Sequence, residues 1–278
     1  MIKLSVIVPV YNEEKTVLEI LRRVRAQKIE GVSIETIVVD DCSKDGTVAQ
    51  LKAHPELYTT LIRHETNGGK GAAVRSGLRA ATGDYVLFQD ADLEYDPADY
   101  VNLLYPVLQL KADVVMGSRV LAPRYLRIFY LTHRLGNQLI TFIFNVLFNK
   151  TFSDVYTCYL LFRTELVKAD ELRTSGWEQQ AEILAKCVRR SLVHYDVPIS
   201  YHGRTYGEGK KIRAHHVISV IWTMFRERFM SYSGTRWRDS ESFSRRPSQP
   251  TPLLQPAFGP TSRKPSRAGR DKRTKKAA

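Results

Sequence analysis

The sequence predicts an α/β protein with a mostly parallel sheet and helices on both of its faces. Short apolar runs alternate with segments of helical spacing along residues 1–119, and this alternation is typical of parallel sheets. The runs are continuous, as in LSVIVPV at residues 4–10, which favours strands buried on both faces. Polar side chains follow the end of each run, where open parallel sheets bind their ligands.

Each expected element rests on its own pattern. Strands are expected at the apolar runs, residues 4–10, 35–40, 59–64, 84–90 and 112–119. Helices are expected at the segments between them, residues 13–27, 46–54, 69–82 and 97–109. The first of these segments has the spacing of an amphipathic helix, with one apolar face made of Val17, Ile20, Leu21 and Val24.

Two later segments, residues 123–149 and 215–229, are apolar but interrupted by charged side chains such as Arg134 and Arg226. Neither has the roughly 18 uninterrupted apolar residues of a membrane-spanning helix. We therefore expect interfacial helices that lie on a lipid surface, with arginines near the lipid phosphates. The alternative is that both segments pack on the sheet or form a dimer contact.

The positive charge is concentrated at the C-terminal end. Residues 231–278 contain 12 Lys and Arg against 3 Asp and Glu, so they carry +9 of the net charge of +13 and leave +4 to the rest. This segment is rich in Ser, Pro and Arg and lacks hydrophobic periodicity, which predicts a disordered basic tail. Residues 1–230 are the expected folded domain, and the overall 43% hydrophobic content is enough for a sizeable core.

The cysteines and the N-terminus indicate the compartment. Cys42, Cys158 and Cys187 are odd in number and show no pairing or metal-binding spacing, so we expect no disulfides and a reducing environment. The chain enters a strand directly after Met1, so no secretory signal is expected. Both features favour the cytoplasm.

Four carboxylates follow the fourth expected strand in the stretch FQDADLEYDP, namely Asp90, Asp92, Glu94 and Asp96. A turn before a helix that Pro97 opens would explain some of them. A divalent metal site would explain why like charges gather there in a basic protein. Hard oxygen ligands at this spacing suit Mg²⁺ or Mn²⁺ held together with substrate phosphates.

The other strand ends carry weaker signals. After the first strand, Tyr11 can stack on a nucleobase and Glu13 can accept from base or ribose donors, although a helix cap at Asn12 explains the same residues. Asp41 precedes a turn in VVDDCSKDGT, and TNGGKGAA places Lys70 at a helix start suited to phosphate. The spacing is not that of a P-loop.

Taken together, these motifs resemble the family 2 glycosyltransferases of the GT-A fold, a Rossmann-like α/β fold. The resemblance rests on IVPVYNEE, IVVDDCSKDGT, NGGKGAAVRSGL, GDYVLFQDADLEYDP and VMGSR. The later FSDVYTCYLLFRTEL and HYDVPISYHGRTYGEGKKI are similar to the branch of dolichyl- and polyprenyl-phosphate sugar synthases. The resemblance as a whole covers residues 3–228. It implies a nucleotide-sugar-binding half at 1–119 and an acceptor-binding half at 120–230.

The resemblance implies a role for individual residues. The residues that contact the nucleoside in the family match Pro9, Tyr11, Glu13, Val39 and Asp41. Its D-x-D motif, which holds the metal and the donor diphosphate, matches Asp90, Ala91 and Asp92, and Glu94 stands where many relatives have Gln as a further ligand. Its phosphate-binding basic residues match Arg119, Arg204 and Lys210. The catalytic residues implied are Asp92, Arg119 and Arg204.

The implied reaction transfers a hexose, mannose or glucose, from a GDP- or UDP-sugar to a polyprenyl phosphate, with inversion and with Mg²⁺ or Mn²⁺. A phosphate acceptor needs no general base, because it is already largely dianionic at neutral pH. Asp154 is the nearest candidate base, and we interpret it as structural or acceptor-orienting. We expect peripheral contact with the cytoplasmic face of a membrane.

Two alternatives stay open from the sequence. The first is the same fold acting on a glycan or small-molecule hydroxyl, which would need a positioned general base. The second is a non-catalytic basic protein that binds nucleic acid or a membrane through its tail. That second alternative predicts that the polar residues at the strand ends have been lost. All of them are present, so nucleic acid is not the expected partner.

Overall fold

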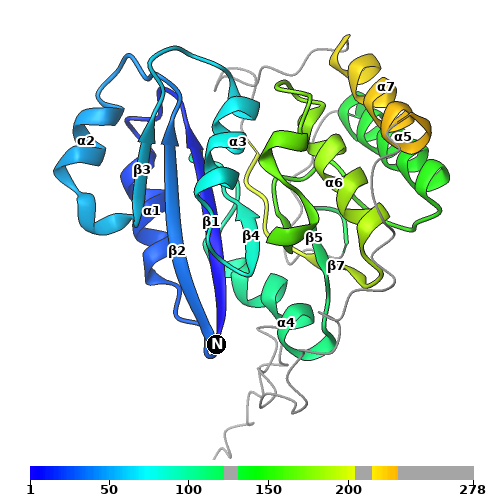
Figure 1. Ribbon diagram of the computed structural model, residues 1–278, viewed down its shortest axis with the longest axis horizontal. Coiled ribbons are helices and arrows are strands. Elements are labelled where there is room, and N and C mark those ends of the chain that lie inside the picture. Colours follow the sequence, from blue (N-terminus) through cyan, green and yellow to red (C-terminus); the bar gives the residue numbers. More distant parts are fainter. Residues whose placement is uncertain (122–130, 204–214, 231–278) are drawn as a thin grey trace, which may run out of the picture.

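The computed structural model describes residues 1–121, 131–203 and 215–230. Within these residues, a seven-stranded sheet in the order β3-β2-β1-β4-β6-β5-β7 runs through the centre of the molecule (Figure 1). Its strands are β1 (Ile2–Val10), β2 (Val32–Asp40), β3 (Thr60–Arg63), β4 (Tyr85–Phe88), β5 (Val114–Ser118), β6 (Leu160–Arg163) and β7 (His194–Pro198).

The strands share one direction except β6. Strand β1 pairs in parallel with β2 and β4, and β2 pairs in parallel with β3. Strand β6 is antiparallel to both β4 and β5, so β5 and its parallel partner β7 again run with β1. The carboxyl ends of six strands therefore lie along one edge of the sheet, which brings the polar strand-end residues together.

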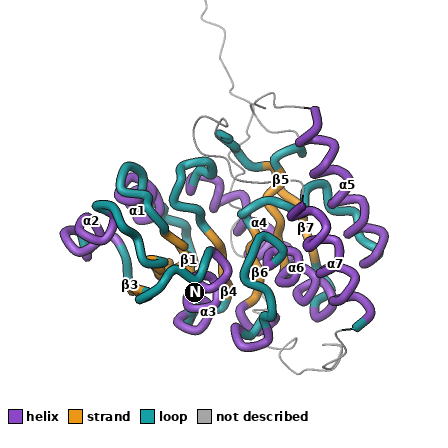
Figure 2. The backbone as a smooth tube through the Cα atoms, turned by 90° about the horizontal axis from the view of Figure 1, so that it is seen from above, coloured by secondary structure: helices purple, strands orange, loops and turns teal. Residues whose placement is uncertain are grey.

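The helices are α1 (Val17–Ala26), α2 (Thr47–Ala53), α3 (Lys70–Ala80), α4 (Tyr100–Leu110), α5 (Leu131–Phe148), α6 (Gln179–Arg190) and α7 (His215–Phe229). Short 3-10 turns lie at Pro55–Leu57, Pro97–Asp99, Thr164–Leu166 and Ala169–Glu171. Figure 2 shows α1 and α3 on opposite sides of the strands, and α5 and α7 side by side at the end farthest from α2.

The core lies on both faces of the central strands. All four residues of β4 are buried, and so is most of β1, because helices cover the sheet on either side. Helix α1 buries the apolar face expected from its spacing, Val17, Ile20, Leu21 and Val24. On the other face, α3 approaches β1 at Gly77, where a Cβ atom would lie 2.4 Å from a methyl carbon of Ile7. The glycine thus permits close packing of this helix on the sheet.

The structure confirms the predicted class and the five predicted strands. The helices expected in the first half are also present, although the segment 97–109 begins as a 3-10 turn before α4. Strands β6 and β7 and helix α6 were not predicted. Because β6 and β7 join the same sheet as β1, the two expected halves of residues 1–230 share one core. The tail at 231–278 lies outside the described residues.

Candidate active site

The loop after β4 is fixed by a buried amide. Gln89 is fully buried, and its Oε1 accepts hydrogen bonds from the hydroxyls of Tyr100 and Tyr159 at 2.8 and 2.7 Å. Its Nε2 donates to the carbonyl oxygens of Asp90 and Tyr95 at 3.0 and 3.4 Å. A buried amide with all these partners is costly to move. The backbone that carries the D-x-D motif is therefore rigid at both ends.

The predicted metal ligands lie on this loop but have separate partners. Asp90 forms an ion pair with the Lys70 ammonium, and Asp92 accepts a hydrogen bond from the Glu94 amide at 3.1 Å. Glu94 accepts from the Tyr201 hydroxyl at 2.9 Å, which turns its carboxylate toward the β7 side. Among the described residues, no group of three or more His, Cys, Asp and Glu side chains is gathered for a metal ion. The assignment of the three carboxylates as ligands stays a prediction.

The donor set nevertheless fits a divalent cation. Asp90 and Asp92 supply the hard carboxylate oxygens that Mg²⁺ and Mn²⁺ prefer. The Lys70 ammonium beside Asp90 already shows that this position holds positive charge. These two aspartates are the residues that would hold the metal.

Asp41 is used inside the structure as a loop anchor. Its buried carboxylate accepts hydrogen bonds from the backbone amides of Gly68 and Gly69 at 2.9 and 2.7 Å and contacts Nδ1 of His64 at 2.7 Å. Two residues further along, the Gly71 amide donates to the Ser175 carbonyl at 3.1 Å. The amides of Gly68, Gly69 and Gly71, in the segment that the sequence pattern favours for phosphate, thus already have protein acceptors. The predicted nucleoside contact of Asp41 stays a prediction.

The loop after β1 is bonded to the loop after β2. Asn12 donates from its amide to Ser43 Oγ at 2.9 Å and accepts from the Lys44 amide at 2.8 Å. Glu13 donates from its amide to Thr47 Oγ1 at 3.0 Å, and its carboxylate accepts from Thr16 Oγ1 at 2.7 Å. These contacts support the two loops against each other.

The aromatic ring and the hydrophobic residues predicted at the nucleoside site differ in their exposure. Tyr11 is 41% exposed at the edge of the sheet, as a stacking ring must be. Pro9 and Val39 are opposite each other in the register of β1 and β2. Val39 is fully buried, so its predicted nucleoside contact stays a prediction. Ala91 is buried beside the two D-x-D aspartates.

Three strand-end loops contain a residue in the left-handed region. These are Asn12, Cys42 and Leu93, with φ angles of 55°, 63° and 62°, after β1, β2 and β4 respectively. Such angles cost a non-glycine residue on the order of 1–2 kcal/mol, and they cluster at functional sites where the surroundings enforce them. The hydrogen bonds of the adjoining loops supply that enforcement here.

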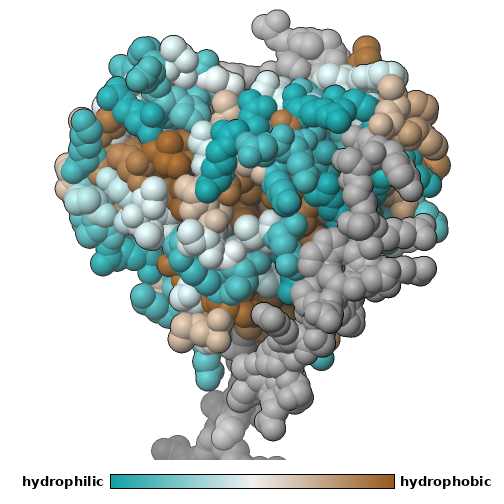
Figure 3. All heavy atoms as spheres, in the orientation of Figure 1, coloured by the Kyte–Doolittle hydropathy of each residue, from teal (hydrophilic) through white to brown (hydrophobic). Residues whose placement is uncertain are grey.

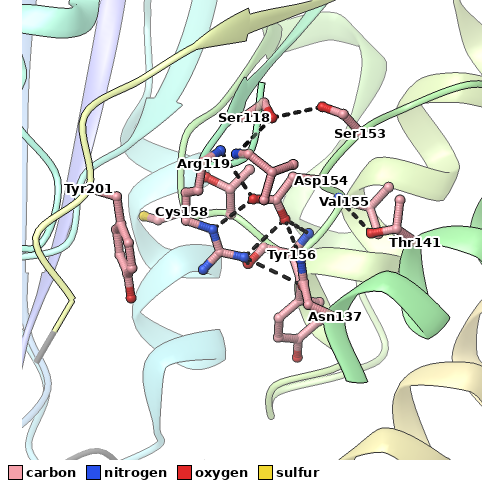
Figure 4. Close-up of polar contacts among 12 residues, drawn as sticks. Ser118, Arg119, Asn137, Thr141, Ser153, Asp154, Val155, Tyr156, Cys158 and Tyr201 are labelled. Atoms are coloured by element: carbon pink, nitrogen blue, oxygen red, sulfur yellow. Dashed lines mark hydrogen bonds and ion pairs between the residues drawn. The ribbon is translucent and has the colours of Figure 1, made fainter. Parts of the chain in front are cut away.

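Arg119, at the end of β5, forms a bidentate ion pair with Asp154 (Figure 4). Its Nε and Nη2 donate to the two carboxylate oxygens at 2.7 and 2.9 Å, and Nη2 also donates to the Tyr156 carbonyl at 2.8 Å. Asn137 on α5 donates to the same carboxylate at 3.0 Å. The central carbon of the guanidinium lies over the Tyr201 ring, 5.2 Å from its centroid. Arg119 is thus held at the active edge of the sheet by α5, β5 and the loop before β6.

This pairing determines the protonation state of Asp154. Burial raises the pKa of Asp154, but the charge and hydrogen bonds of Arg119 outweigh burial and bring the pKa below its usual value. Backbone amides of Arg119 and Tyr156 add further donors at 3.2 and 3.3 Å. A fully buried carboxylate with these partners is a poor general base. These bonds agree with the structural role expected from the sequence, and the acceptor-orienting role stays a prediction.

Two predicted phosphate-binding residues, Arg204 and Lys210, lie outside the described residues. Sequence reasoning missed Gln89 and Asn137, both of which hold site residues in place. The signal for Gln89 was available, since an amide inside the apolar run YVLFQD must find buried partners. Asn137 gave a weaker signal as a polar residue within an apolar helix.

Comparison with known proteins bears on the family and the fold of the chain. The sequence profile of glycosyl transferase family 2 matches residues 5–169. The chain is 28% identical over 211 residues to a dolichol-phosphate mannosyltransferase of Pyrococcus furiosus, a match that covers 75% of this chain and 59% of that protein. It is 27% identical over 212 residues to a UDP-N-acetylglucosamine–dolichyl-phosphate N-acetylglucosaminyltransferase of Methanococcus voltae, covering 69% of this chain and 83% of that protein.

Among solved structures, the fold resembles glucosyl-3-phosphoglycerate synthase from Mycobacterium tuberculosis. The TM-score is 0.59 at 20% identity, and the match covers 82% of this chain and 80% of that one. That protein was crystallised with Mn²⁺, UDP and glucosyl-3-phosphoglycerate, and also with Mg²⁺ and UDP. At this identity the likeness shows the shared fold.

Proposed function

Since the chain belongs to glycosyl transferase family 2, we propose that it transfers a hexose, mannose or glucose, from a GDP- or UDP-sugar to a polyprenyl or dolichyl phosphate. The family membership rests on the match over residues 5–169 and agrees with the resemblance seen in the sequence. The two relatives named above carry dolichyl phosphate in their names, which supports the same class of acceptor. The chain corresponds to 59% of the length of the first of them.

The donor would bind along the carboxyl edge of the sheet. Tyr11 and Glu13 would contact the nucleoside, and Asp90 and Asp92 would hold the metal together with the donor diphosphate. The metal, when bound, would neutralise charge that develops on the leaving diphosphate. Arg119, Arg204 and Lys210 are the basic residues proposed to contact the phosphates.

The state of Asp154 is the observation that carries the choice of acceptor. Its carboxylate is bonded to Arg119 and Asn137, and its pKa lies below the usual value. A hydroxyl acceptor needs a base to take its proton, whereas a phosphate acceptor is already ionised at neutral pH. The site around Arg119 therefore favours a phosphate that attacks the anomeric carbon directly, with inversion.

The outer faces of α5 and α7 support a lipid-bound acceptor. Both helices expose large apolar side chains along one face, namely Leu131, Leu135, Leu139, Phe142, Val146, Ile218, Trp222, Phe225 and Phe229. Part of this apolar face is seen in Figure 3 as tan and brown spheres at the α5–α7 end. Exposed apolar faces of this extent mark contacts with a membrane or a partner.

Two of the charged residues of α7 face the protein, whereas Arg228 is exposed. Glu227 is buried and pairs with Lys186 of α6 at 3.2 Å, and Arg226 donates to the same carboxylate at 3.3 Å. A helix with its ion pairs against the protein and its aromatic residues outside is suited to lie on an apolar surface. In the described part of the chain, each helix is too short or too polar to cross a bilayer. We propose peripheral contact at the cytoplasmic face of a membrane.

A donor panel tests this function. The full chain with Mn²⁺ and a short polyprenyl phosphate is incubated separately with GDP-mannose, UDP-glucose and UDP-N-acetylglucosamine, and the lipid-linked sugar is measured. We expect transfer from GDP-mannose or from UDP-glucose, and we expect Asp92→Asn or EDTA to abolish it. Transfer by none of the donors, or full transfer in EDTA, would contradict the proposal.

A further inference from the structure

An ammonium group of this chain lies at the carboxylate proposed to hold the metal. Lys70 is the first residue of α3, and its Nζ donates a hydrogen bond to Asp90 Oδ1. The Lys70 side chain is 47% exposed and that of Asp90 is 22% exposed, so the pair is accessible from solvent. The ion pair joins the glycine loop after β3 to the D-x-D loop after β4.

The backbone beneath Lys70 is held on both sides. Gly69, with a φ angle of 80°, and Gly68 donate to Asp41, while Gly71 donates to the Ser175 carbonyl. A Cβ atom at Gly71 would lie 2.3 Å from that carbonyl oxygen, so the approach requires glycine. The base of the side chain is therefore fixed, and only its flexible four-carbon stem is left to move.

We propose that Lys70 is an exchangeable counter-ion, which neutralises Asp90 until a divalent cation takes that carboxylate and which then binds the donor diphosphate. This inference depends on the proposed function only in taking Asp90 as a metal ligand. Because an ammonium and a divalent cation repel each other at one carboxylate, Lys70 would leave Asp90 when a cation binds there. The nearest negative charge that donor binding would add is the diphosphate, which Asp90 and Asp92 would hold through the metal.

The charge of Lys70 persists through this exchange. The Lys70 ammonium is paired with a carboxylate before the exchange and would be paired with a phosphate after it, and both partners carry negative charge. The exchange thus moves a full positive charge from a carboxylate to a phosphate, which accepts hydrogen bonds from ammonium groups equally well.

The exchange predicts opposite effects on two ligands. Removing the ammonium removes a competitor, so the metal alone should bind more tightly. Removing it also removes a phosphate contact, so a nucleoside diphosphate should bind less tightly in the presence of the metal. A residue that only supported the fold would weaken both, which separates the two explanations.

The test measures binding to the full chain without acceptor or turnover. Mn²⁺ is titrated alone and followed by electron paramagnetic resonance, and GDP and UDP are then titrated at saturating Mn²⁺ by calorimetry. For Lys70→Met we expect Mn²⁺ to bind about three- to tenfold more tightly, and the diphosphate that binds wild type to bind about tenfold more weakly. Lys70→Gln should behave in the same way.

Two controls fix the interpretation. Lys70→Arg keeps a positive charge beside Asp90, so its Mn²⁺ affinity should stay near that of wild type. Lys52→Met removes an exposed lysine on α2 and should change neither affinity. Mn²⁺ binding by Lys70→Met that is unchanged or weaker would overturn the proposal, and so would equal tightening in Lys70→Arg. The donor panel above can fail while this result holds, because no sugar transfer is measured here.

Discussion

At the scale of single residues, the bond between Arg119 and Asp154 has the largest consequence for chemistry. This bond makes the Asp154 carboxylate a poor proton acceptor and fixes the Arg119 guanidinium at the edge of the sheet that carries the candidate site. The Asp154 side chain is fully buried and that of Arg119 is 20% exposed, so removal of one partner leaves a poorly solvated charge.

Asp154→Asn tests this role. Because Arg119 would lose its counter-charge, we expect the free energy of unfolding to fall by about 3 kcal/mol, as for other buried pairs that lose one member. Urea unfolding measures the change. Asp170→Asn is the matched control, since it removes an exposed partner of Arg79 and should leave the unfolding free energy unchanged within error.

The pH dependence of the rate separates a positioning role from a basic role. If Asp154 only holds Arg119, Asp154→Asn lowers kcat but keeps the shape of the pH–rate profile. Loss of one limb of the profile in this variant would show that Asp154 acts as the base.

At the scale of elements, Glu35 of β2 joins β1 to the turn before β4 at the amino edge of the sheet. Its carboxylate is buried and accepts from the Thr82 amide and hydroxyl, both at 2.7 Å, and from Ser5 Oγ of β1. The Lys3 ammonium lies 2.6 Å from it. Burial raises the pKa of Glu35, but the hydrogen bonds from Lys3, Ser5 and Thr82 outweigh burial and lower the pKa from 4.5 to about 2.

This depressed pKa predicts acid sensitivity of the sheet. The unfolded chain takes up a proton near pH 4.5 and the folded chain only near pH 2, so the contribution of Glu35 is complete above pH 4.5 and is lost as the pH falls toward 2. The contribution is about 3 kcal/mol at neutral pH. Urea unfolding of wild type and Glu35→Gln should show a difference that shrinks between about pH 5 and pH 2. A difference in unfolding free energy between the two proteins that stays constant with pH would contradict this role of Glu35.

At the scale of the whole molecule, the sheet separates a donor edge from the apolar α5–α7 face. Helix α5 contributes to both, because Asn137 contacts Asp154 while Phe142 and Val146 face outward. A lipid phosphate bound near Arg119 would therefore extend its chain toward this apolar face. In the proposed function, this arrangement would bring a lipid acceptor and a polar donor to one site.

The apolar face predicts vesicle binding. Trp222→Gln combined with Phe229→Gln should weaken binding of the full chain to phosphatidylglycerol-containing vesicles by about tenfold. The reason is that two large apolar side chains are no longer buried in the lipid. Co-sedimentation with the vesicles measures this. Leu192→Gln is the control, since Leu192 is exposed but lies outside α5 and α7. Equal loss in the control would show that binding is not specific to this face.

The sequence predicted the first half of the fold better than the second. Residues 1–119 have continuous buried strands between amphipathic helices, so the pattern indicates each element. Strand β7 reads HYDVP and mixes polar residues with a proline, because it pairs at the edge of the sheet and has little apolar pattern to show. Helix α6 was missed although its buried face includes Glu182 and Lys186, which a search for apolar spacing reads as exposed positions.

The candidate site was predicted as a set of residues, while their pairing was not. Strand ends converge in any parallel sheet, so Tyr11, Asp41, Asp90 and Arg119 were expected at one edge. The bonds that decide their roles join residues far apart in the chain, such as Asp41 with Gly69 and Arg119 with Asp154. No spacing in the sequence reports such contacts, because they depend on how the loops pack.

The most direct test of the central claim compares two acceptors that differ only in the phosphate. Initial rates are measured with polyprenyl phosphate and with the free polyprenol of the same length, using the donor found in the panel, across the pH range. The account predicts transfer to the phosphate alone, with a rate that rises as the acceptor ionises near a pKa of about 6 and then levels off. Comparable transfer to the free alcohol would contradict it, because a hydroxyl needs the base that Asp154 does not provide.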